Sequence, residues 1–100
     1  MRYHFVYLCD NVPVLRVYSP SPLLREWLRK SNFNRLLPRN GTPLLLKYVT
    51  PVYELSDEVR ARLISHCQLA TWHDVRIRSS QLELLARLRD TKYTYLGFME

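Results

Sequence analysis

The sequence contains few of the residues and tracts that oppose compact folding. It has two glycines and six prolines in 100 residues, and no repeated or biased tract. This composition argues against disorder, and a hydrophobic share of 47% is enough for one core. We therefore expect a single globular domain over residues 1–100.

Long apolar runs are also missing. The longest, such as FVYLC at residues 5–9, fall far short of the roughly 20 residues that a membrane span requires. The first ten residues lack the apolar stretch and the cleavage site of a signal peptide. We expect a cytoplasmic protein without a membrane partner.

Cysteine is scarce as well. Cys9 and Cys67 are too few for a secreted domain that depends on disulfides, so we expect two buried free thiols, with a bridge between them as the alternative. No Cys or His pair has metal-binding spacing, and no cofactor motif occurs. The sequence therefore predicts neither a metal site nor a cofactor. The residues of ligand type are His4, Cys9, His66, Cys67, His73 and Asp74.

Acidic residues are absent from residues 27–53, and the stretch LRKSNFNRLLPRNGTP at residues 28–43 carries four positive charges. The formal net charge of +6 lies entirely in residues 1–50, because residues 51–100 hold seven basic and seven acidic side chains. Such asymmetry indicates an anionic partner. Arginine outnumbers lysine twelve to three, and its planar fork of donors suits phosphates and carboxylates.

Residues 1–20 have the pattern of a β-hairpin. The segments RYHFVYLC and VPVLRVYS are rich in aromatic and β-branched residues, and Asp10-Asn11 between them suits a two-residue turn. Alternation places Tyr3, Phe5 and Tyr7 on one face, with His4, Val6 and Leu8 on the other. Pro13 indicates that the second strand either lies toward an edge of the sheet or starts irregularly.

Three helices are expected after the hairpin. Ser21 as N-cap and Pro22 as first residue begin one whose apolar side holds Leu23, Leu24, Trp27 and Leu28. Ser56, followed by two acids, begins another that ends near Ala70. A capping box predicts the third, over residues 81–89. The cap residues are Ser80 and Glu83, and the expected buried residues of the last two helices are Val59, Leu63, Cys67, Ala70, Leu82, Leu85 and Leu88.

Three further strands complete the expected fold. They cover residues 44–55, interrupted at Pro51, residues 74–79, where Val75 and Ile77 would point inward, and residues 92–99. The order is roughly ββαβαβαβ. We expect an α+β domain in which three helices pack on one mostly antiparallel sheet.

The leading hypothesis is a partner-binding surface in the first half of the chain. Basic residues with an aromatic ring among them suit either an acidic protein patch or single-stranded nucleic acid, whose bases would stack on the ring. The alternative is that the aromatic and leucine side chains belong to the core, with ordinary solvated charges around them. The predicted binding residues are Arg25, Arg29, Lys30, Phe33, Arg35, Arg39 and Lys47.

A second basic group contains Arg76 and Arg78, with Arg87 and Arg89 further along the chain. Nearby acids such as Glu83 make a salt-bridged surface the better interpretation of this group, and Arg76 and Arg78 a secondary candidate. A helix-turn-helix is disfavoured because about ten residues separate its two candidate helices.

The sequence thus predicts a small, non-enzymatic binding protein. It would dock its arginine-rich half, residues 25–47, onto an acidic surface of a larger protein or nucleoprotein assembly and modulate or block it, in the manner of phage-encoded inhibitors. Direct, non-specific nucleic-acid binding through the same residues is the alternative. A further alternative is a metal-independent ribonuclease that uses general acid–base groups. Its candidate groups are His73, Arg87, Lys92, Tyr93 and Tyr95.

Overall fold

A computed structural model of the chain describes residues 2–38, 52–70 and 75–99, and it begins with the predicted hairpin. Strand β1 (Arg2–Cys9) pairs antiparallel with β2 (Val12–Tyr18). The φ angles of Asp10 and Asn11 are 51° and 65°. Two successive left-handed residues form the primed turn whose twist matches that of paired strands, and Asp and Asn tolerate this conformation.

The edge position of β2 explains why a proline is tolerated within it. The strand order is β2-β1-β4-β3, so β2 has β1 as its neighbour on one side and is the outermost strand of the described sheet. A two-residue turn makes Cys9 and Val12 a hydrogen-bonded pair, and alternation then turns the backbone of Pro13 away from β1. Its missing N–H therefore costs no bond of the ladder. The predicted edge location is confirmed.

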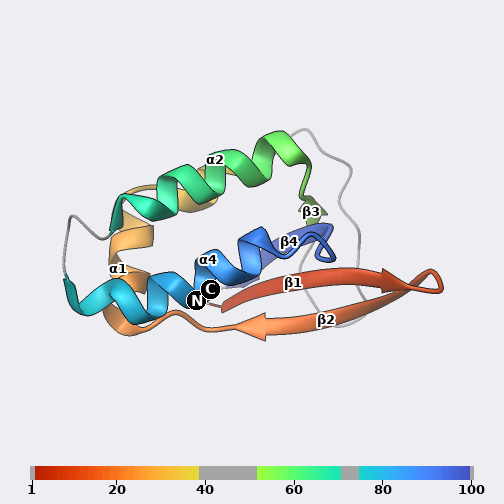
Figure 1. The fold of residues 1–100 in the computed structure, drawn as a ribbon, viewed down its shortest axis with the longest axis horizontal. Helices are drawn as coiled ribbons and strands as arrows, with labels where there is room; N and C mark the ends of the chain where they lie inside the picture. The colour runs from red at the N-terminus through yellow and green to blue at the C-terminus, as the bar shows by residue number, and fades with distance from the viewer. Residues whose placement is uncertain (1, 39–51, 71–74, 100) are drawn as a thin grey trace.

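The rest of the described sheet comes from the second half of the chain. Strand β4 (Tyr95–Met99) pairs antiparallel with β1 and with the short β3 (Tyr53–Glu54). Arg2 faces Met99 in this register, so the two ends of the described chain lie side by side (Figure 1). Most of the strand expected over residues 44–55 lies outside the described residues. The expectation of an α+β fold with an antiparallel sheet is confirmed.

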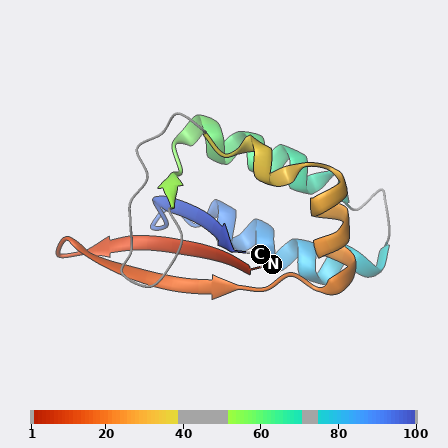
Figure 2. The same cartoon turned by 180° about the vertical axis from the view of Figure 1, so that it is seen from behind.

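The described helices cover one face of this sheet (Figures 1 and 2). That face carries Tyr3 and Phe5 of β1 with Leu96 of β4, all fully buried. Their core includes leucines of each described α-helix, so the layers share one apolar interior. The helical elements are α1 (Pro22–Lys30), the 3-10 turn η1 (Phe33–Leu36), α2 (Asp57–Gln68), the 3-10 turn η2 (Val75–Ile77) and α4 (Arg78–Arg89).

The strand expected over residues 74–79 is wrong. Residues 75–77 form η2, which leads directly into α4 at Arg78. A pattern of three alternating residues is too short to distinguish a tight helical turn from a strand. Val75, which was expected to point inward, is 80% exposed, whereas Ile77 reaches the core as predicted. Because the helix begins three residues before residue 81, Ser80 lies inside it, and the predicted capping box does not form.

The buried stripe of α4 also differs from the prediction. It runs through Gln81, Leu84, Leu85 and Leu88, at spacings of three and four residues. Leu82, expected in the core, falls outside this stripe and is 51% exposed. In α2, by contrast, Val59, Leu63 and Cys67 are all buried, as predicted, and so is Ala70 just beyond the end of the helix.

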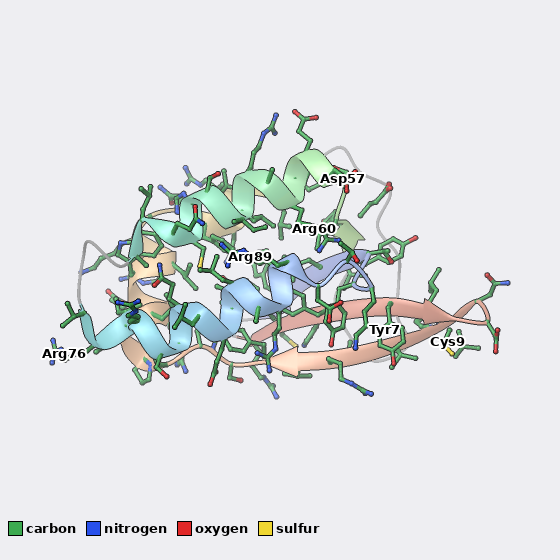
Figure 3. All side chains as sticks on the ribbon, viewed as in Figure 1. Tyr7, Cys9, Asp57, Arg60, Arg76 and Arg89 are labelled. Carbon is green, nitrogen blue, oxygen red and sulfur yellow. The ribbon has the colours of Figure 1, made fainter. Side chains whose placement is uncertain are left out.

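Two polar side chains join α2 to α4. Gln81 is buried, and its Nε2 donates to the backbone oxygens of Cys67 at 2.9 Å and Gln68 at 3.2 Å. These are among the last carbonyls of α2, which lack partners within the helix. Arg60 extends from α2 to the end of α4 and donates to the backbone oxygens of Leu88 and Tyr93 (Figure 3). Each helix therefore supplies donors to carbonyls near the other's C-terminus.

Candidate binding surface

Helix α1 forms because its N-terminus is capped and its apolar residues are correctly spaced. The Ser21 side chain accepts a hydrogen bond from Leu24 N at 3.3 Å, and Pro22 is the first helical residue, as predicted. Leu24 and Leu28 are buried against the core. The opposite side of the helix is left to its charged residues.

The exposed side of α1 carries more positive than negative charge. Arg29 Nη2 lies 2.6 Å and Lys30 Nζ 3.6 Å from Glu26 Oε1. The two cations are about two-thirds exposed, and Glu26 is about half-exposed. The hydrogen bond from Arg29 lowers the pKa of Glu26, which therefore stays ionised. One carboxylate thus serves two cations, while Arg25 has no ion-pair partner among the described residues.

The secondary candidates Arg76 and Arg78 lie at the same end of the molecule as α1. Element η2 contacts α1, with buried Ile77 between two exposed arginines, and Figure 3 shows Arg76 projecting from this end. We call this the end basic surface. It consists of Arg25, Arg29 and Lys30 of α1, Arg76 of η2 and Arg78 of α4.

The loop before α1 and the first turn of α4 are held together by hydroxyl groups. Tyr18 Oη lies 2.8 Å from Ser80 O and 3.0 Å from Ser80 Oγ, and Ser80 Oγ accepts from Ser21 N at 3.1 Å. Arg87 stacks on the Tyr18 ring at 4.7 Å. Sequence reasoning missed this junction, which fixes α1 relative to α4. Beside it lies a hollow of about 310 Å³ lined by Ser19, Ser21, Arg76, Ser79, Ser80 and Glu83.

Phe33 is not available to a partner, which corrects the prediction that its ring would be accessible. It is fully buried and meets the Tyr3 ring edge-on, with ring centroids 5.7 Å apart. The short turn η1 directs this ring into the core. A nucleobase therefore has no access to Phe33 in this structure.

Arg35, another predicted residue of the first half, does not join the end basic surface. Arg35 is exposed and lines a hollow of about 240 Å³ with Tyr53 and Phe98, which belong to β3 and β4. Arg39 and Lys47 lie outside the described residues. Of the five predicted binding residues that the structure describes, three therefore contribute to the end basic surface.

His66 connects the end of α1 to α2. Its Nε2 lies within hydrogen-bond distance of Ser31 Oγ, at 2.8 Å, and the same hydroxyl oxygen lies 3.2 Å from Leu28 O. The imidazole packs against Trp27 with ring centroids 5.3 Å apart. Burial lowers the pKa of His66, so the neutral form predominates at neutral pH.

Among the described groups proposed for ribonuclease chemistry, Arg87 and Lys92 lie in different places. Arg87 stacks on Tyr18, whereas Lys92 lies over the rings of Tyr7 and Tyr93 at 5.4 and 5.2 Å. Tyr93 is buried in the core. His73 lies outside the described residues. The structure therefore assigns Arg87 and Lys92 to separate aromatic contacts.

Both cysteines are free, so the alternative of a Cys9–Cys67 bridge is wrong. Cys67 is buried as expected, and burial raises the pKa of its thiol to about 12. Cys9 is exposed near the hairpin turn, which corrects the prediction that both thiols are buried. Within residues 2–38, 52–70 and 75–99, no three side chains of His, Cys, Asp or Glu are grouped closely enough to hold a metal ion.

In the described part of the chain, no helix combines the length and the apolar character needed to cross a membrane. The chain matches no family model, no curated protein and no solved structure.

Proposed function

We propose that this is a non-enzymatic binding protein that docks its end basic surface onto an acidic protein patch of a larger macromolecular assembly, and so modulates or blocks that assembly. The observation that carries the proposal is the grouping of five exposed cations on α1, η2 and the start of α4. On these same elements, the acids near the surface are Glu26 and Glu83.

The physical argument concerns summed charge. At physiological ionic strength the screening length is about 8 Å, so neighbouring exposed cations reinforce one another's field, whereas distant ones do not. Arginine adds a planar fork that can bind a carboxylate through two hydrogen bonds. Four of the five cations are arginines.

An acidic protein patch is favoured over single-stranded nucleic acid because the expected stacking ring is missing from the surface. Single-stranded nucleic acid is commonly bound by basic residues together with exposed aromatic rings. Phe33 is fully buried, and Trp27 packs against His66. Phe33 therefore offers no exposed ring beside these charges, and Trp27 is half-buried.

The test is affinity capture from a nuclease-treated lysate of the source cells with three forms of the protein. The surface variant is Arg25→Glu/Arg78→Glu. The control, Arg2→Glu/Arg16→Glu, makes the same change of charge on exposed residues of the β1–β2 hairpin. We expect proteins with acidic surfaces to be retained by the wild type and the control and lost by the surface variant. Equal retention by all three forms would refute the proposal.

Nucleic-acid binding is tested separately with labelled oligonucleotides at low and at physiological salt. A mainly electrostatic phosphate binder loses affinity steeply as salt rises. We expect any binding to have disappeared by physiological salt. Tight binding there, abolished in the surface variant, would instead assign the surface to nucleic acid.

A further inference from the structure

A shallow groove runs along α2 where η1 packs against that helix. Its volume is about 550 Å³, and Figure 2 shows the chain after α1 passing alongside α2. Leu69, at one end of the groove, is 56% exposed. The groove is lined by Leu36, Ala61, Arg62, Ser65, His66 and Leu69.

The helical spacing of α2 explains the hollow. Ala61, Ser65 and Leu69 follow one another at intervals of four residues, on a different side of the helix from the buried Val59 and Leu63. Small side chains at the first two positions leave space above the helix. Leucines from η1 and from the end of α2 supply apolar walls.

Positive charge lies at the rim of this groove. Arg62 lines it directly. At the α1 side, Trp27 and Ser31 both contact His66, so the groove adjoins the last turn of α1, which carries Arg29 and Lys30. Among the described residues, no acidic side chain lines the groove, although Arg62 is paired with Glu58 on the next turn of α2. An apolar floor beside the basic last turn of α1, where two cations share one carboxylate, complements an acidic segment that carries a hydrophobic residue.

We infer that this groove holds an apolar side chain of the acidic segment whose carboxylates contact the end basic surface. The inference rests on the proposed function for the identity of the partner as an acidic protein, and it adds the residue that anchors the partner. Nucleic acid has no aliphatic side chain for such a groove. Buried apolar anchors surrounded by charge are what give an electrostatic contact its residence time and specificity.

A random peptide library displayed on phage tests the inference without assuming the sequence of the partner's segment. Selection on the wild-type protein should enrich peptides that combine Asp or Glu with a Leu, Phe or Trp. In amide NMR spectra of isotope-labelled protein, these peptides should shift the signals of Ala61, Ser65 and Leu69. Failure to enrich any peptide, or enrichment of basic or purely polar peptides, would overturn the inference.

Matched leucine variants test the groove itself. Leu69→Asn removes an apolar wall without adding charge, and Leu82→Asn makes the same change at a leucine of similar exposure on α4. Loss of a leucine contact should weaken the selected peptides by about tenfold or more. Leu82→Asn should leave their affinity unchanged. Equal effects of the two substitutions would contradict the groove assignment.

The surface variant separates the failure of this inference from that of the proposed function. Peptides that lose affinity for Arg25→Glu/Arg78→Glu but bind Leu69→Asn normally would overturn the groove and leave the basic surface standing. Peptides that lose affinity for Leu69→Asn alone would support the groove and overturn the proposed docking surface.

Discussion

Replacement of Arg60 by methionine should destabilise the fold far more than its position on a solvated helix suggests. Its guanidinium donates to the backbone oxygens of Leu88 at 2.7 Å, Asp90 at 3.2 Å and Tyr93 at 2.5 Å. Hydrogen bonds from a charged donor contribute about 1.5–3 kcal/mol each. Water can replace some of them, and Arg60 Nε is buried without a partner, so we expect a total loss of about 2–4 kcal/mol.

The assay is urea denaturation followed by circular dichroism, with Arg62→Met as the control. Arg62 lies on the same helix but forms an exposed ion pair with Glu58, so its replacement should cost less than about 1 kcal/mol. For a domain of this size, the Arg60 variant should also lose roughly 10 °C in melting temperature. Equal stability of the two variants would refute the assignment of Arg60 as the link between α2 and the end of α4.

Three further predictions concern the folded core. Because burial holds the pKa of His66 below its ordinary value of 6.5, the unfolded chain takes up a proton more readily; stability should be complete above about pH 6.5 and fall below it. His66→Gln should flatten that acid limb in urea titrations, and an unchanged slope would contradict this. Ser80→Ala should cost about 1–2 kcal/mol through loss of the hydroxyl junction, against less than about 0.5 kcal/mol for Ser79→Ala in the same assay. Leu84→Ala should cost about 2–5 kcal/mol, whereas Leu82→Ala should cost under about 1 kcal/mol; similar thermal melts for the two would show that the buried stripe is misassigned.

Features that depend on neighbouring residues were predictable from the sequence. The left-handed turn at Asp10-Asn11, the cap at Ser21 and the cap at Ser56 each follow from the preferences of a few adjacent residues. The buried stripe of α2 is similarly encoded in its own spacing. Local chemistry determines these features, so no tertiary information was needed.

Features that depend on contacts between distant segments were not predictable. Ser80 matched a capping box, but its hydroxyl bonds to Ser21 and Tyr18, about 60 positions earlier in the chain. Gln81 would ordinarily be assigned to the surface, and it is buried because the carbonyls at the end of α2 accept its amide hydrogens. Such partners are determined by how the helices pack, which the sequence pattern alone does not reveal.

The candidate surface was predicted in part for the same reason. The acid-poor stretch identified the charges of α1, but it could not show that η1 turns Phe33 into the core. Nor could it show that Arg76 and Arg78 come next to α1 from a segment about 50 residues later, since that requires the packing of η2 on α1. The sequence predicted the positive charge of the surface, but only some of the residues that form it.

The most direct test of the docking proposal is an amide NMR spectrum of isotope-labelled protein before and after addition of the acidic partner recovered by affinity capture. Chemical-shift changes should concentrate on Arg25, Arg29, Lys30, Arg76 and Arg78 of the end basic surface. Changes confined to the β1–β2 hairpin, or the recovery of no partner that distinguishes the surface variant from its control, would contradict the proposal.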